Sequence, residues 1–351
     1  MAEFFSEYGL FLAKTLTVVA AFIAVIIVAA SAGSRNRPKA EGVLEIHKLN
    51  QRYDELLHAL KQAVMTPVQF KEHAREKKRQ AKELKKADKK GGSSEQEPTQ
   101  RVYVLDFEGD IRANAVNALR EEISAVLRIA DNNDEVVLRL ESPGGVVNGY
   151  GLAASQLARV RSAGISLTVV VDKVAASGGY MMACVANKIV AAPFAVLGSV
   201  GVVGQLPNFH RLLKKHDIDY EMLTAGEYKR TLTVFGENTD VGRKKFAEDL
   251  EETHELFKEF VSENRPELNI DEIATGEIWF GSRALENKLV DEIETSDGYI
   301  QRLIDTADVY EVRWIEKKRL SERISDQLQS VLEKAGMKIL ERSTRRDEFT
   351  R

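Results

Sequence analysis

A run of apolar residues near the N-terminus constrains the fold of this chain most strongly. No charged side chain occurs between Lys14 and Arg35, and residues 16–32 are aliphatic, aromatic or small. About 20 such residues span the ~30 Å hydrocarbon layer of a bilayer as a helix, which satisfies every backbone polar group internally. We therefore expect residues 1–35 to form a transmembrane anchor, with the lipid bilayer as a partner.

The cleavage and the orientation of this segment are left open by its flanks. The small residues at 30–32 resemble a signal-peptide cleavage site, but Glu3 and Glu7 near the N-terminus and the long apolar run favour an uncleaved anchor. Basic residues at 35–39 follow the segment. By the positive-inside rule they place the rest of the chain in the cytoplasm.

Residues 36–98 are predicted to form a helical stalk and linker. Apolar side chains recur at helical spacing over 41–65, residues 71–90 are strongly basic with interspersed Glu, and a Gly-Ser stretch begins at 91. We favour a solvated helix for the basic stretch over a patch for anionic lipid head groups. Nucleic acid is not expected as a partner, because no aromatic residues interleave the basic ones and the net charge is −4.

After residue 98 the pattern becomes an alternation of strands and helices. The composition, 44% apolar and 30% charged, is that of a globular chain. Strands are expected at 102–107, 135–140, 167–171, 196–203 and 220–223, and helices at 113–129, 149–162, 207–216 and 240–263. This rhythm predicts an α/β fold with largely parallel strands over a catalytic domain, 99–310, followed by a strand and an amphipathic helix over 311–351.

Two glycine-bearing junctions follow predicted strands and precede predicted helices. They are ESPGG at 141–145 and AASGGY at 175–180. Unpaired backbone N–H groups at such a junction stabilise negative charge, although glycines there can also serve only as tight turns. Neither junction matches a phosphate or dinucleotide loop, the single cysteine excludes a cysteine-rich zinc site, and we expect no cofactor and no metal.

A serine nucleophile at one of these junctions needs a base within hydrogen-bond reach. None of the histidines lies in a glycine-bounded context, so a Ser-His-Asp triad is unsupported; they are His47, His58, His73, His210, His216 and His254.

Four motifs, in order, resemble those of the signal peptide peptidase A (protease IV) family. They are ESPGG, VDKVAASGGYMMACVANKIVA, LGSVGVVG and TAGEYKRTL. The short, membrane-anchored SohB type of that family is the most similar, over the stretch from the N-terminal helix to about residue 310. The resemblance implies a Clp-protease and crotonase-like fold with a repeated ββα core, and a serine peptidase that uses a Ser/Lys dyad.

The resemblance also implies a role for each motif residue. Ser177 matches the nucleophile, Lys229 the general base, and Ser199 the serine that orients the lysine. Gly144 and Gly178 match the backbone oxyanion site.

A lysine can act as the base only in its neutral form. Because the ordinary pKa of lysine is ~10.4, we expect Lys229 to be buried, where the charged form is disfavoured. Lys173, four residues before Ser177, is a rival base, but its place at a strand end favours an ordinary surface cation.

We therefore expect a membrane-anchored serine endopeptidase that cleaves unfolded or apolar peptides, such as signal-peptide or membrane-protein remnants. A catalytically silent scaffold and a crotonase-like acyl-CoA enzyme are the alternatives. The resemblance further implies a homo-oligomer in which neighbouring subunits can share the dyad. It places the protein in the bacterial inner membrane with the catalytic domain in the periplasm, against the cytoplasmic side that the basic flank favours.

Overall fold

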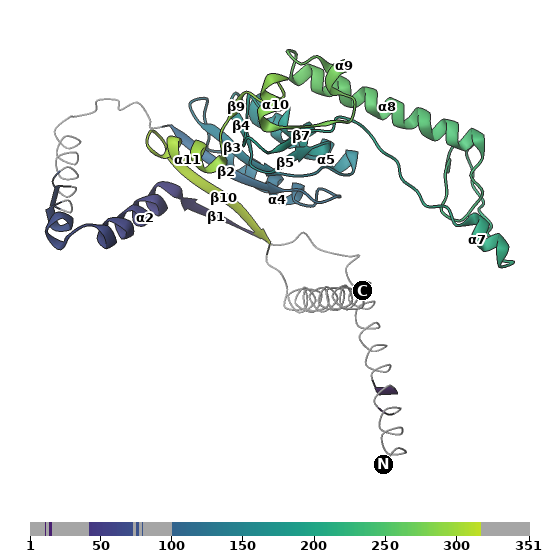
Figure 1. Ribbon diagram of the computed structural model, residues 1–351, viewed down its shortest axis with the longest axis horizontal. Helices are drawn as coiled ribbons and strands as arrows, with labels where there is room; N and C mark the ends of the chain where they lie inside the picture. The colour runs from purple at the N-terminus through teal and green to yellow at the C-terminus, as the bar shows by residue number, and fades with distance from the viewer. Residues whose placement is uncertain are drawn as a thin grey trace, which may run out of the picture. The chain divides into compact units, whose positions relative to one another are not determined.

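The computed structural model describes residues 11, 14–15, 42–72, 75–76, 79 and 100–316 (Figure 1). One compact unit spans Leu44–Trp314, and residues 1–43 and 315–351 form the other. Among the described residues no helix has the length and apolar character needed to cross a bilayer. The predicted transmembrane segment at 16–32 and the predicted C-terminal amphipathic helix lie outside the described residues.

A seven-stranded sheet forms the centre of the Leu44–Trp314 unit. Its order is β1-β10-β2-β3-β4-β6-β9, and every recorded pairing from β10 to β9 is parallel. The strands are β1 (Gly42–Lys48), β10 (Asp308–Glu316), β2 (Arg101–Glu108), β3 (Glu135–Glu141), β4 (Ser166–Val171), β6 (Lys188–Ala191) and β9 (Glu292–Ile293). The predicted α/β class with largely parallel strands is confirmed.

A second, three-stranded sheet carries two of the predicted site residues. In it β5 (Val174–Ala176) pairs in parallel with β7 (Val196–Gly198), which pairs antiparallel with β8 (Ile278–Phe280). Ser177 follows β5 directly and Ser199 follows β7 directly. The short sheet therefore sets the position of both serines.

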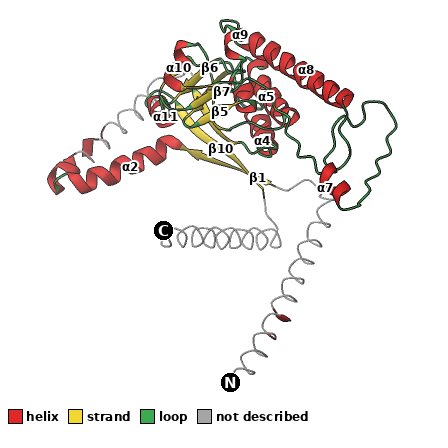
Figure 2. Ribbon diagram, turned by 45° about the vertical axis from the view of Figure 1, so that its right-hand side comes forward, coloured by secondary structure: helices red, strands yellow, loops and turns green. Residues whose placement is uncertain are grey.

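Helices cover both faces of the large sheet because its strands are apolar on both sides (Figure 2). Leu138 of β3 belongs to the core shared with α4 (Val116–Val126), α5 (Val147–Ser162) and α6 (Gly178–Ala183). Its neighbour Val137 belongs to the core on the opposite face, with α11 (Ser296–Ile304) and Leu49 of α2 (Leu49–Val64). Cys184, which caps the C-terminus of α6, is fully buried in the first core.

Residues 201–239 form an extended stretch, here called the arm, that carries α7 (His210–Lys215) and leads into the long helix α8 (Asp240–Asn264) (Figures 1 and 2). None of the residues in the arm is buried. The shorter helices α9 (Ile270–Ile273) and α10 (Gly281–Glu286) follow α8.

Three sequence predictions of local structure are corrected. Residues 42–48, predicted as helix, form β1 at the edge of the large sheet, beside β10; Val43 and Ile46 have the three-residue spacing of a helix, but both side chains are exposed. The strand predicted over 196–203 ends at Gly198, where positive φ angles of 90° at Gly198 and 51° at Ser199 interrupt it. Residues 220–223 are exposed and form no strand, since no neighbouring strand pairs with them.

The predicted stalk is also corrected in part, because its first segment belongs to the same compact unit as the catalytic domain. Leu49 is buried in the core. The side chain of Asn50 donates to the carbonyl oxygens of Ile304 and Ala307 at 3.1 and 2.8 Å, and accepts from the N–H of Val309 at 2.8 Å. The start of α2 is therefore fastened to α11 and β10.

Candidate active site

Ser177 occupies a strained turn between β5 and α6. Its φ angle is +51°, a region that costs a residue with a Cβ roughly 1–3 kcal/mol. Its N–H donates to the carbonyl oxygen of Gly198 at 2.8 Å, which holds the turn in place. Strain of this kind clusters at catalytic sites, where the surrounding structure fixes the geometry of a reacting side chain.

Gly144 and Gly178 lie directly beside Ser177. Gly144 has a φ of +91°, and a Cβ at this position would lie 2.8 Å from Ser177 Cβ and 2.8 Å from the nitrogen of Gly178. A Cβ on Gly178 would overlap the ring of Tyr150. Both positions therefore require glycine, and together they bring two stretches of backbone against the serine.

Ser199 is the neighbour of Ser177 in the short sheet. The parallel register pairs Ala176 with Gly198, so the two serines directly follow paired residues at the ends of adjacent strands. Ser199 shares the φ of +51°, and its N–H donates to the carbonyl oxygen of Glu277 at 2.6 Å. The fold thus brings together both serines and both glycines of the predicted site.

Lys229 lies on the arm and is solvent-exposed. No hydrogen bond joins it to Ser177 or Ser199 among the described residues. The ring of the adjacent Tyr228 lies 5.8 Å from Nζ of Lys245 in the first part of α8. Along the helix, Lys245 is about 18 Å from Phe257, one of the α8 residues in the core. Within one protomer the predicted base is therefore neither buried nor bonded to the predicted nucleophile.

Lys173 is a paired surface cation. Its Nζ lies 2.8 and 3.1 Å from the carboxylate oxygens of Glu141, and its side chain is 72% exposed. The hydrogen bond to Glu141 raises the pKa of Lys173, which stabilises the charged form. A general base needs the opposite shift, so Lys173 does not meet the requirement.

Beneath Gly144 lies a chain of hydrogen bonds that the sequence did not single out. The Gly144 N–H donates to Ser142 Oγ at 3.1 Å. Ser142 Oγ lies 2.5 Å from the hydroxyl of Tyr150, which donates to the carbonyl oxygen of Asp110 at 2.8 Å. The available signal was a serine inside ESPGG and a tyrosine in the helix that follows. The Gly144 N–H is therefore already bonded. The N–H of the next residue, Gly145, has no hydrogen-bond acceptor among the described residues.

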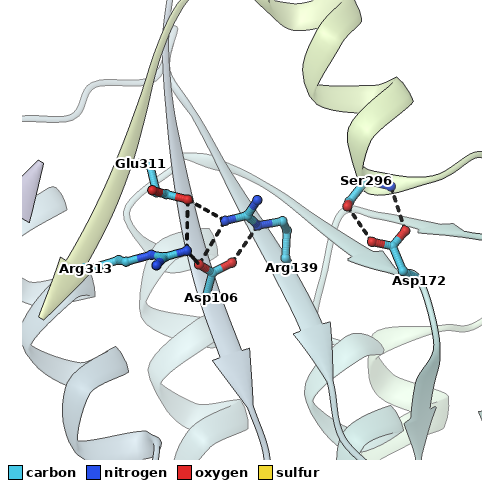
Figure 3. A network of polar contacts seen from close by, with 6 residues as sticks. All are labelled: Asp106, Arg139, Asp172, Ser296, Glu311 and Arg313. Carbon is cyan, nitrogen blue, oxygen red and sulfur yellow. Dashed lines mark hydrogen bonds and ion pairs between the residues drawn. The ribbon is translucent and has the colours of Figure 1, made fainter. Parts of the chain in front are cut away.

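A polar hollow of about 310 Å³ opens on the α11 side of the large sheet. Among its lining residues, Arg139 bonds to Asp106 at 2.6 Å and, outside the lining, to Glu311 at 2.6 Å, and Arg313 bonds to the same two carboxylates (Figure 3). Beside it Asp172 accepts from the N–H and hydroxyl of Ser296 at the start of α11. These groups satisfy one another, and no metal-holding cluster of His, Cys, Asp and Glu occurs in the described ranges.

Comparison with known proteins identifies the family. Residues 3–157 match "Peptidase family S49 N-terminal" and residues 159–310 match "Peptidase family S49". The chain is 51% identical over 329 residues to the "Probable protease SohB" of Haemophilus influenzae, covering 93% of each chain. It is 56% identical over 239 residues to that of Buchnera aphidicola subsp. Acyrthosiphon pisum, covering 68% of this chain and 71% of the relative. With "Protease 4" of H. influenzae the identity is 28% over 201 residues, 55% of this chain and 32% of the relative.

The chain belongs to peptidase family S49, since the two family matches together cover most of it. Its mixed α/β fold, with a serine at a strained turn, agrees with the serine peptidase that this family defines. Within that family it is of the SohB type.

Proposed function

We propose that the protein is a membrane-anchored endopeptidase in which Ser177 attacks the peptide carbonyl and Lys229 acts as its base. The observation that carries the proposal is the strained turn of Ser177, pressed against Gly144 and Gly178 with Ser199 on the adjacent strand. A peptidase of this kind needs a fixed nucleophile and backbone donors next to it, and these residues supply both.

The proposed reaction conserves protons at every step. Neutral Lys229 takes the Ser177 proton while Oγ forms a bond to the peptide carbonyl carbon, and the oxyanion is stabilised by backbone N–H groups of the Gly144 turn and Gly178. The Lys229 ammonium then gives its proton to the departing amine as the peptide bond breaks. In the second half, neutral Lys229 takes a proton from water as its oxygen bonds to the acyl carbon, and the ester bond to Ser177 Oγ then breaks. The Lys229 ammonium returns the proton to Oγ, and the product leaves with a new carboxyl group. Ser199 is proposed to orient the amine.

We assign the base to a neighbouring copy of the chain. A neutral lysine requires removal from water, and Lys229 of the protomer is exposed. The arm also exposes large apolar side chains that a second copy would cover; they include Val203 (76%), Leu212 (53%), Ile218 (53%) and Leu223 (95%). A homo-oligomer that buries the arm would bury Lys229 with it and place its amine at Ser177 of the next copy.

Mixed oligomers test the assignment. Ser177→Ala and Lys229→Ala are each expected to abolish cleavage of an unfolded substrate, such as reduced and carboxymethylated lactalbumin. Co-expression of the two variants should restore part of the activity, because an intact Ser177 of one chain then meets an intact Lys229 of another. Full activity of Lys229→Ala alone would remove the dyad, and two inactive variants that stay inactive when co-assembled would place the dyad within one chain.

The fold likeness to Clp protease and the crotonases belongs to the same proposal. It is supported by the order of the strands: β4 of the large sheet is followed by β5 of the short sheet and α6, and β6 is followed by β7 in the same way. Family membership favours peptidase chemistry over the silent scaffold and the acyl-CoA alternatives.

The substrates and the membrane side complete the proposal. Unfolded or apolar peptides, including signal-peptide and membrane-protein remnants, fit an enzyme anchored in the bacterial inner membrane by residues 16–32. We place the catalytic domain in the periplasm on the family resemblance. An alkaline phosphatase fused to the C-terminus is expected to be active, whereas fluorescence of a green fluorescent protein fusion with no phosphatase activity would place the domain in the cytoplasm.

A further inference from the structure

Tyr150 contacts both backbone segments of the proposed oxyanion site. Its ring lies under Gly178, so closely that a Cβ on that glycine would overlap it, and its hydroxyl is bonded to Ser142, the acceptor for the Gly144 N–H. Tyr150 and Ser142 are both fully buried, so neither is placed to touch a substrate. We infer that these two residues are positioning residues that hold the Gly144 turn against Gly178 for catalysis.

The directions of the hydrogen bonds are fixed by their ends. A backbone N–H only donates, so Ser142 Oγ must accept from Gly144. A carbonyl oxygen only accepts, so the Tyr150 hydroxyl must donate to Asp110. The remaining proton, that of Ser142, therefore points to the Tyr150 oxygen across 2.5 Å. We call this chain of hydrogen bonds, from the Gly144 N–H through Ser142 and Tyr150 to Asp110, the relay. Every donor in the relay is used, and loss of either hydroxyl leaves a neighbouring group without its hydrogen bond.

The loop at residues 109–111, where the relay ends, is also hydrogen-bonded to the Gly144 turn. Gly109 N–H donates to the carbonyl oxygen of Glu141 at 2.8 Å, and Val146 N–H donates to that of Ile111 at 2.8 Å. A Cβ on Gly109 would overlap the hydroxyls of both Ser142 and Tyr150, so the loop fits closely over the relay. The turn is thus bonded before, beneath and after Gly144, and the relay is the link that runs through the protein interior.

The relay determines which backbone N–H groups are free to stabilise an oxyanion. The Gly144 N–H is held by Ser142, which leaves the adjacent Gly145 N–H as the donor of this turn that can act with the Gly178 N–H. A small displacement of such donors is costly, because oxyanion stabilisation depends on preorganised geometry. This inference rests on the proposed function, in which backbone donors stabilise an oxyanion formed at Ser177.

Tyr150→Phe is the sharpest variant, because it keeps the ring under Gly178 and removes only the hydroxyl. We expect kcat per titrated active site to fall about 10- to 100-fold with KM changed less than about twofold. Affinity for a peptide boronate, which bonds to the serine and mimics the oxyanion, should fall in parallel, whereas affinity for a product peptide should not. Tyr180→Phe is the matched control, since it removes a fully buried hydroxyl that donates to the carbonyl oxygen of Leu289 at 3.0 Å.

Ser142→Ala is the second variant and keeps the test decisive if Tyr150→Phe folds poorly. Its kcat should fall similarly, and the double variant should lose little more than either single one, because both act through one relay. Normal kcat and boronate affinity in Tyr150→Phe or in Ser142→Ala would overturn the inference, as would an equal loss in Tyr180→Phe. Cleavage that survives Ser177→Ala would instead overturn the proposed function on which the inference rests.

Discussion

The N–H of Ser177 donates to the carbonyl oxygen of Gly198 at 2.8 Å, so the predicted nucleophile is bonded to the residue that precedes Ser199. Both serines have a φ of +51°, and each follows a strand of the short sheet. The two strained turns therefore support each other. A change at Gly198 should act on Ser177, although 21 positions separate them in the sequence.

Gly198→Ala should displace Ser177 and slow its reaction with a fluorophosphonate probe by about 10-fold or more. A Cβ on Gly198 would lie 2.5 Å from the ring of Trp279, and the φ of +90° adds strain. Gly164→Ala is the control, because its φ is +77° and its new Cβ meets first the side-chain oxygen of Asn132, at 3.0 Å. Both variants should lose about 1 kcal/mol to backbone strain. Equal labelling rates would contradict the coupling.

Glu122→Gln should stabilise the protein at alkaline pH. Glu122 is 4% exposed, its Oε1 accepts the Trp314 N–H at 2.7 Å, and burial raises its pKa from 4.5 to about 7. A carboxyl with a raised folded-state pKa costs stability as it ionises, so the cost grows between pH 4.5 and 7 and is complete above pH 7. The variant should gain about 3 kcal/mol at pH 8 and under about 1 kcal/mol at pH 5.

Urea unfolding at the two pH values measures this gain. Glu251→Gln, at an exposed position of α8, is the control. A Glu122→Gln variant with the same unfolding free energy as the wild type at pH 8 would show that the buried carboxylate carries no ionisation cost.

Arg139→Ala should destabilise the protein by about 3 kcal/mol, because it leaves the carboxylates of Asp106 and Glu311 without a partly buried partner. Arg283→Ala removes an ion pair with Glu286 whose side chains are 72% and 61% exposed, and should cost under about 1 kcal/mol. Urea unfolding of both variants at pH 7 gives the comparison. Similar losses would mean that the cluster in Figure 3 is solvated like a surface pair.

Asn50→Ala should destabilise the catalytic unit by about 2–3 kcal/mol, because the side chain makes three hydrogen bonds to the backbone near the end of α11 and the start of β10. Asn117→Ala, which removes an exposed bond from Arg120, should cost under about 0.5 kcal/mol. Thermal unfolding followed by active-site titration measures both. An unchanged transition in Asn50→Ala would show that the start of α2 acts as a separate stalk.

The sequence was sufficient to predict features that depend on local periodicity. The strands predicted at 102–107, 135–140 and 167–171 correspond to β2, β3 and β4, and the helices predicted at 149–162 and 240–263 correspond to α5 and α8, whereas the three-residue strand β5 before Ser177 is too short to give a periodic signal and was not predicted. Residues 42–48 were mispredicted because Val43 and Ile46 have the spacing of a helix, whereas the place of β1 beside β10 is a tertiary contact that no local pattern specifies.

The parts of the site that sequence could not supply depend on tertiary contacts. Ser142 lies in the turn after β3 and Tyr150 in the first part of α5, and the hydrogen bond between them depends on how the turn packs against the helix. No local sequence pattern specifies that bond. The environment of Lys229 is set by the arm, whose exposed residues give no signal of what covers them. The pairing of that amine with Ser177 stays a prediction for the mixed-oligomer experiment.

The burial of Cys184 has a practical consequence. The chain has one cysteine, and burial raises the pKa of its thiol to about 12, so it is shielded from alkylating reagents in the folded state. The native protein is thus ready for site-specific spectroscopy without removal of any residue. A thiol introduced by Leu223→Cys would be the reactive one, and a dye or spin label there would report directly whether the arm meets another copy.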